Sequence, residues 1–178
     1  MNASDFQKEL IQTLNERFTE LGFDTRLVPD APEGGGQIGD TLAFLMPITE
    51  RGDRVLTELR FAVSGGETYY VQIFTTLFTE LNESLSELER LLGALNYKTG
   101  FGAYGVLHES GLLWHKYGCA VREFDFIDGA EGFAVALLDI LDLIREQFTA
   151  VYGVLTAVAS GAVAGEQALS DMMGLSKQ

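Results

Sequence analysis

VLTELRFAVSGGETYYVQIFT, residues 55–75, is the stretch that decides the fold. In both halves of this stretch every second residue is apolar or β-branched, and two glycines lie between the halves. Alternation with a period of two predicts two strands that each bury one face. Because buried faces must match across a hairpin, we expect Phe61 opposite Tyr69, with Ser64-Gly65-Gly66 as a three-residue loop.

Alternating and helical patterns extend from this hairpin in both directions. Residues 42–48 predict a strand before it, and residues 102–109 and 112–121 predict a second hairpin, joined through Ser110-Gly111. Apolar residues spaced three or four apart predict three helices, over 4–22 with Ser4 as N-cap, over about 81–96, and after a cap at 128–131 as far as Tyr152. The order helix, three strands, helix, two strands, helix predicts an α+β fold whose antiparallel sheet is packed by helices.

The C-terminal segment has a different composition. Residues 147–165 contain no charged side chain, and small residues recur at every fourth position, at Gly153, Ala157, Gly161 and Gly165. A helix there would carry a ridge of small residues that permits close packing. More than half of the segment is Gly, Ala, Ser or Thr, so we expect a helix packed at the core or a subunit contact rather than a membrane span. We therefore divide the chain into one α+β domain over 1–152 and a helical extension over 153–178.

Charge and cysteine usage narrow the class of protein. The chain has 12 Lys and Arg against 26 Asp and Glu, a formal net charge of −14, and its basic residues are scattered along the sequence. Such a charge repels the phosphates of nucleic acids and of anionic lipids, so we expect neither as a partner. Cys119 is the only cysteine, and residues 1–10 lack the basic and apolar regions of a secretory signal. These features predict a cytoplasmic protein.

Residues 91–117 carry a resemblance to a known family. A leucine-rich helix ends in Leu95-Asn96, a hairpin of glycines and aromatic residues follows at 100–105, and a strand with alternating aromatic residues contains Trp114 and Tyr117. Together with the order of elements, this pattern resembles the YbjN-like group of bacterial proteins, which shares the type III secretion chaperone fold. The resemblance spans about residues 6–152. It implies a homodimer that binds segments of other proteins without catalysis.

His108, His115 and Cys119 are the residues that could form a metal or nucleophile site. With a two-residue turn at Ser110-Gly111, His115 would face Val106, and the two histidines would be diagonal neighbours roughly 7 to 8 Å apart at the backbone. No acidic residue on that face completes a metal site, and Cys119 lies in a strand rather than at a helix N-terminus. We favour two histidines packed among Tyr104 and Tyr117. The alternative is a small-molecule or metal site on the face of His108, His115 and Tyr117.

Two further motifs have structural explanations. Residues 34–39, GGGQIG, match the GxGxxG pattern, but a proline-rich loop precedes them and a strand follows, whereas a nucleotide site requires a preceding strand and a following helix. Acidic residues also surround the start of the third helix, where carboxylates stabilise the positive end of the helix dipole. These residues are Glu123, Asp125, Asp128 and Glu131. Neither motif predicts a catalytic site, and we expect no cofactor.

The leading prediction is a non-enzymatic protein-binding module, a chaperone-like protein or regulatory adaptor that binds a segment of a partner protein. Its candidate partner-binding residues are aromatic side chains of the sheet, Phe74, Tyr104 and Tyr117. A homodimer contact is expected on the second helix and the small-residue segment. The residues assigned to that contact are Leu85, Leu88, Leu92, Gly153 and Gly161.

Overall fold

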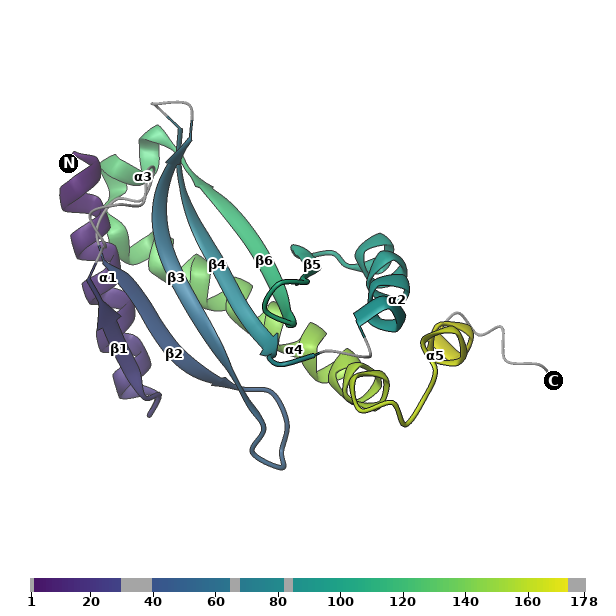
Figure 1. The fold of residues 1–178 in the computed structure, drawn as a ribbon. Helices are drawn as coiled ribbons and strands as arrows, with labels where there is room; N and C mark the ends of the chain where they lie inside the picture. Colours follow the sequence, from purple (N-terminus) through teal and green to yellow (C-terminus); the bar gives the residue numbers. More distant parts are fainter. Residues whose placement is uncertain (1, 30–39, 65–67, 82–84, 173–178) are drawn as a thin grey trace.

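A computed structural model of the chain describes residues 2–29, 40–64, 68–81 and 85–172. In these residues the fold is mixed α+β, with a six-stranded antiparallel sheet and five helices (Figure 1). The strands are β1 Thr25–Val28, β2 Thr41–Pro47, β3 Arg54–Ser64, β4 Thr68–Phe78, β5 Ala103–Leu107 and β6 Leu112–Val121. The helices are α1 Ala3–Glu20, α2 Leu85–Lys98, α3 Glu123–Asp128, α4 Ala130–Ala159 and α5 Gly165–Met172.

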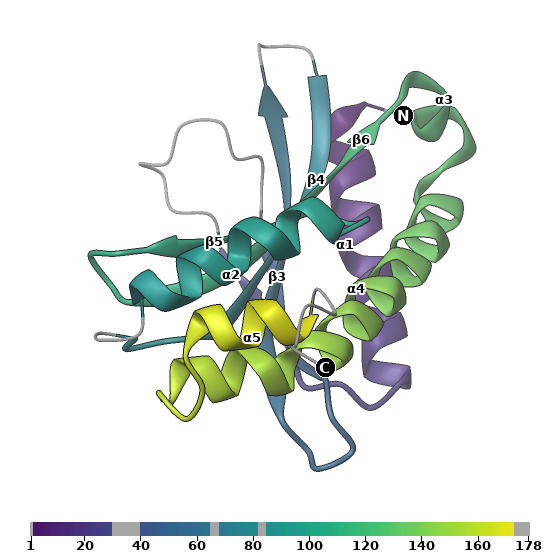
Figure 2. The ribbon, with the colours of Figure 1, turned by 90° about the vertical axis from the view of Figure 1, so that its right-hand side faces the viewer.

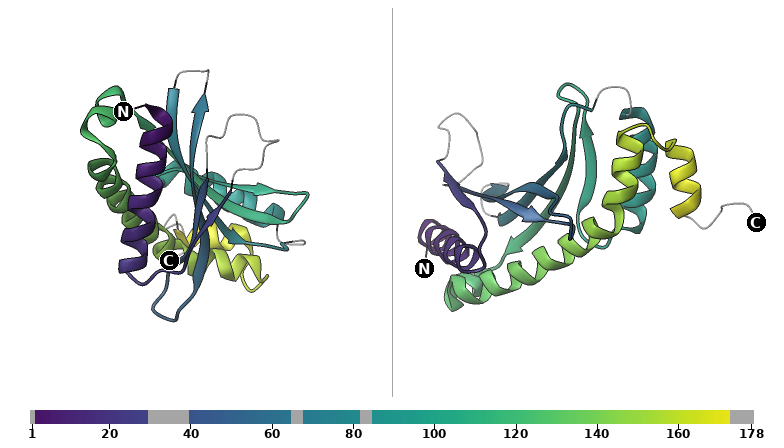
Figure 3. Two further views of the ribbon diagram at one scale, coloured as in Figure 1. Left: turned by 90° about the vertical axis from the view of Figure 1, so that its left-hand side faces the viewer. Right: turned by 90° about the horizontal axis from the view of Figure 1, so that it is seen from below.

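The sheet has the strand order β1-β2-β3-β4-β6-β5, and each neighbouring pair is antiparallel. Helices α1 and α4 lie behind it in Figure 1, and the view from below in Figure 3 shows both on the same side of the sheet. The core lies between this helical layer and the odd-numbered residues of the central strands, of which Leu59, Phe61 and Ile73 are almost completely buried. The alternating pattern at 55–75 therefore predicts the buried face correctly.

The register of the β3–β4 hairpin differs from the prediction by two residues. Phe61 pairs with Val71, and Tyr69 pairs with Val63 rather than with Phe61. A shift of two residues leaves every side chain on the same face of the sheet. The burial pattern therefore predicts which side chains are buried, but it does not predict which residues pair across the hairpin. Ser64 of the predicted loop is the last residue of β3, and Gly65 and Gly66 lie outside the described residues.

The β5–β6 hairpin has a longer turn than the sequence indicated. Leu107 is paired with Leu112 and Tyr104 with His115, so the predicted pairing of His115 with Val106 is wrong. Residues 108–111 form the turn, where the Gly111 N–H donates to the His108 carbonyl at 3.4 Å and Gly111 has a φ of 58°. Glycine adopts this left-handed conformation without strain, which explains its place at the turn.

Two elements, β1 and α3, were not predicted, α5 lies within the predicted helical extension over 153–178, and two helix ends differ. Asn2, rather than Ser4, caps α1, and its side-chain oxygen accepts the Asp5 N–H at 2.9 Å. The final predicted helix continues as α4 through Tyr152 to Ala159. None of the described helices combines the length and apolar character that crossing a bilayer requires.

The ridge of small residues is not continuous, which corrects the expectation of one packed helix. Gly161 has a φ of 71° just after α4 ends, so the chain turns there. α5 then returns alongside α2, as Figure 2 shows, and the Gly165 N–H donates to the Glu87 carboxylate at 2.7 Å. A Cβ on Gly165 would come within 2.5 Å of the Glu87 carbonyl oxygen, so this glycine allows close contact between α2 and α5.

Candidate functional site

The sheet is covered by helices on one face and open on the other. No described helix crosses the face opposite α1 and α4 (Figure 3). This open sheet face carries the odd-numbered residues of β2 and the even-numbered residues of β3, β4 and β6, including Leu45 and Leu56, which are 39% and 42% exposed. Exposed large apolar side chains gathered on one surface mark contact sites for other molecules.

Cross-strand pairing arranges the side chains of the open sheet face in rows. One row crosses five strands and contains Gly105, Trp114, Thr76, Leu56 and Leu45. The next row crosses all six strands and contains Ala103, Lys116, Phe74, Glu58, Ala43 and Arg26. A mainly apolar row therefore lies beside a row in which Lys116 and Glu58 flank the ring of Phe74.

Trp114 and Phe74 form the aromatic part of this face. Their rings stack with centroids 5.9 Å apart and planes inclined by 24°. Gly105 lies directly across from Trp114, and a Cβ there would approach Cζ2 of the indole to 2.3 Å. The indole therefore lies against the bare backbone of β5, a close approach that only glycine permits.

Of the three predicted partner-binding residues, Phe74 lies on the open sheet face. Tyr104 is only 3% exposed and packs beside Phe148 of α4. Burial raises the pKa of Tyr104 to about 12, and its hydroxyl oxygen accepts a hydrogen bond from Gln147 at 2.9 Å. Tyr117 is half-buried on the helix-covered face, next to Phe101. The three residues predicted to form one binding surface therefore lie on opposite faces of the sheet.

The two histidines lie in different surroundings, so the predicted diagonal pair is wrong. His108 is in the exposed β5–β6 turn, where its Nε2 lies 2.6 Å from a carboxylate oxygen of Glu89 on α2. His115 is completely buried, and its Nε2–H donates to the Phe101 carbonyl at 2.8 Å. Burial lowers the pKa of His115, which favours the neutral imidazole. The four-residue turn separates the histidines because it moves His108 out of β5.

The described residues contain no group of three or more His, Cys, Asp or Glu positioned to hold a metal ion. Cys119 is half-buried in β6, and burial together with the charge of Asp125 raises the pKa of its thiol. A raised pKa keeps the thiol protonated and weakly nucleophilic. The GGGQIG motif at 34–39 lies outside the described residues.

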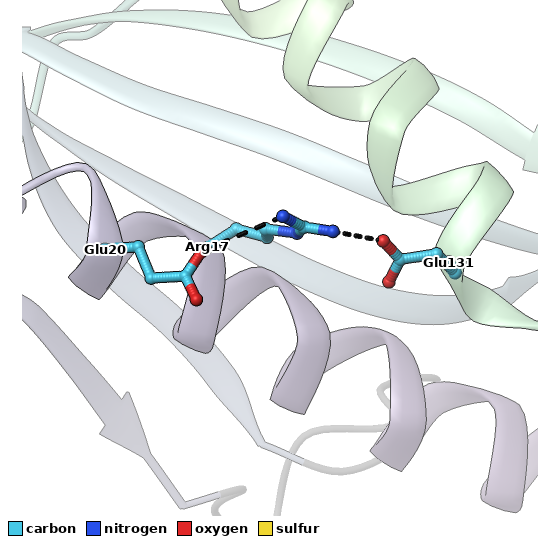
Figure 4. A network of polar contacts seen from close by, with 3 residues as sticks. All are labelled: Arg17, Glu20 and Glu131. Carbon is cyan, nitrogen blue, oxygen red and sulfur yellow. Dashed lines mark hydrogen bonds and ion pairs between the residues drawn. The ribbon is translucent and has the colours of Figure 1, made fainter.

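The described acidic residues near α3 and α4 stabilise the fold through local contacts. Asp125 accepts the Arg122 N–H at 2.6 Å, which caps the start of α3. Glu131 forms an ion pair with Arg17 that connects α4 to α1 (Figure 4). Arg17 also lies 3.8 Å from Glu20 one turn further along α1 (Figure 4). The side chains of Glu123 and Asp128 lie outside the described part of the structure.

The predicted dimer residues fall into two groups. Leu88 and Leu92 are buried within the subunit, and Leu85 is half-buried against the same core. Gly153 and Gly161 are exposed, and Gly153 lines a groove of about 400 Å³ between α4 and α5. The groove is mainly apolar, with Val154, Ala157, Val163, Ala168 and Met172 among its lining residues.

Comparison with known proteins assigns no family to the chain. No family model matches it, and no curated protein sequence matches it. The open sheet face is therefore the feature from which a function can be argued. Sequence reasoning missed Leu45, Leu56 and Trp114 because it considered one face of each strand. The signal was present, since these strands also carry large apolar residues on the opposite face, at an odd position in residues 41–47 and at even positions in residues 54–64 and 112–121.

Proposed function

We propose that this chain is a protein-binding module that holds a segment of a partner protein on the open sheet face and performs no chemistry of its own. The observation that carries the proposal is the group of four large apolar side chains on that face, Leu45, Leu56, Phe74 and Trp114. Aromatic side chains are enriched at protein interfaces because each buries a large area with few rotatable bonds.

The surrounding structure supports binding at this face. The strands below it are hydrogen-bonded to their neighbours in one antiparallel sheet, and their other face is packed against α1 and α4. A rigid platform loses little conformational entropy when a partner docks, which favours affinity. The proposal agrees with the chaperone-like or adaptor role that the YbjN-like resemblance implies, and we place this role in the cytoplasm.

The experiment combines affinity capture with fluorescence. Proteins captured from a bacterial lysate by the immobilised chain would be identified, purified and titrated against the chain. Trp114 is the only tryptophan, so its emission reports directly on the open sheet face when a partner that lacks tryptophan is added. Docking that removes water from the indole is expected to shift this emission to shorter wavelength.

A matched pair of variants makes the test specific. Leu56→Ala removes an apolar contact from the open sheet face, and we expect it to weaken partner binding about tenfold, a typical effect of truncating an interface anchor. Leu143→Ala on α4 is the control, because Leu143 is also 42% exposed but lies on a helix. Equal affinities of the two variants, or saturating binding with no change at Trp114, would contradict the proposal.

A further inference from the structure

The open sheet face is cationic although the protein is strongly acidic. At described strand positions on this face lie four basic side chains, Arg26, Arg54, Arg60 and Lys116, and one carboxylate, Glu58. The whole chain has 12 basic and 26 acidic residues. A third of its basic residues thus lie on one face. The linear sequence does not show this cluster, because the four residues come from three strands, β1, β3 and β6.

Most of these cations are available to a partner. In the described part of the chain, Arg26, Arg54 and Lys116 have no carboxylate within ion-pair distance, whereas Arg60 bonds to Glu58 at 2.8 Å. Three arginines on the helices differ in this respect. Arg17, Arg90 and Arg145 each form an ion pair with a carboxylate. The described carboxylates therefore leave most of the positive charge of the open sheet face unpaired.

Charge and apolar surface alternate on this face. Lys116 lies beside Phe74 in one row, and Trp114, Leu56 and Leu45 form the adjacent row. A partner segment lying across these strands meets apolar side chains and cations at neighbouring positions. Complementary charge selects partners and accelerates their encounter, while the apolar contacts supply affinity.

We infer that the partner segment is acidic and apolar, a polypeptide in which Asp and Glu alternate with Leu or Phe. This inference rests on the proposed protein-binding function and specifies the chemistry of its partner. Nucleic acid fits less well, because a polyphosphate carries a charge on every nucleotide and is repelled by the net charge of −14 more strongly than a peptide in which apolar residues separate the acidic ones.

Three synthetic peptides test this chemistry. They share the same Leu and Phe positions and differ only in carrying Glu, Gln or Lys between them. Binding is measured by Trp114 emission and by anisotropy of a labelled peptide. We expect the Glu peptide to bind at least about tenfold more tightly than the Gln peptide, and its affinity to fall as salt is raised, since exposed charges are screened.

Charge-reversal variants locate the binding site. Lys116→Glu on the open sheet face is expected to weaken binding of the Glu peptide about tenfold, and Arg54→Glu provides a second variant at the same face. Lys8→Glu on α1 is the control, because it produces the same change in net charge at an exposed position on the helical side. Circular dichroism of each variant verifies that it is folded.

The outcomes separate this inference from the function on which it rests. If the Gln or Lys peptide binds as tightly as the Glu peptide and Leu56→Ala weakens it, the acidic partner is wrong while the protein-binding function stands. If no peptide binds, both are contradicted. A further outcome would overturn the inference in favour of another occupant of the face. In that outcome the Glu peptide fails to bind, and the chain instead binds single-stranded RNA or forms a concentration-dependent dimer, which Lys116→Glu abolishes.

Discussion

At the scale of single residues, His115 is a fully buried histidine surrounded by aromatic rings. Its ring contacts Tyr104 and Phe148 edge to face, with centroids 5.0 Å away in both cases, and its Nδ1 is buried without a hydrogen-bond partner. Protonation would place a charged N–H at that position. The imidazole is thus a neutral part of the core, which is the role favoured from sequence, and Tyr104 is one of the two aromatic neighbours expected there.

His115 is predicted to make the fold sensitive to acid. Because its pKa is lowered in the folded state, the unfolded chain binds the proton more readily, and the free energy of unfolding should decrease as pH falls below about 6.5. His115→Gln cannot titrate and should remove up to about 1.4 kcal/mol per pH unit of that decrease. Urea unfolding at several pH values measures it, with His108→Gln as control. Parallel pH profiles of wild type and His115→Gln would contradict the prediction.

Gly105 is predicted to set the position of Trp114. Gly105→Ala would place a methyl group against the indole, so we expect a loss of about 1–3 kcal/mol in unfolding free energy and a change in Trp114 emission. Gly118→Ala on β6 is the control, because a Cβ there meets nothing within 4 Å. Chemical denaturation followed by fluorescence measures both variants. Similar behaviour of the two would show that the indole does not rest on β5.

At the scale of elements, a side chain of α2 forms hydrogen bonds with the outer edge of the edge strand β5. Asn96 accepts the Tyr104 N–H at 2.7 Å and donates to the Tyr104 carbonyl at 2.8 Å. Both backbone groups of Tyr104 are therefore occupied at the sheet edge. An unprotected edge would invite pairing with another chain, so this contact protects the protein from aggregation.

Asn96→Ala is predicted to destabilise the fold by about 1–3 kcal/mol, because it leaves two backbone groups without partners. Asn96→Asp should have an intermediate effect, since a carboxylate still accepts the Tyr104 N–H but cannot donate to the carbonyl. Thermal unfolding ranks the three proteins, and light scattering after mild heating measures aggregation. Equal stability of Asn96→Ala and wild type would mean that β5 does not depend on this contact.

The sequence predicts elements with strong periodicity and misses those without it. The stripe from Phe6 to Phe18 and the alternation at 55–75 identify α1 and the central hairpin because burial imposes these periods. β1 has four residues, three of them exposed, so it leaves no such pattern. The open sheet face escaped prediction for a related reason, since its residues adjoin only through cross-strand register, which depends on turn geometry as well as on burial.

At the scale of the whole molecule, the assembly remains a prediction. We expect a homodimer, as the family resemblance implies, and with Leu88 and Leu92 buried in the subunit its contact should include the Gly153 groove. Gly153→Arg, which introduces a bulky charged side chain, is expected to yield monomers. Light scattering at tens of micromolar measures the mass. A monomeric wild-type protein would contradict the prediction.

The open sheet face as the docking surface is tested most directly by hydroxyl-radical footprinting with and without a captured partner segment. We predict reduced oxidation of Leu45, Leu56, Phe74 and Trp114, and unchanged oxidation of Leu143 and Ile127, which are exposed on helices. Reduced oxidation confined to the helices, with the four open-face side chains as reactive as in the free protein, would contradict the proposed function.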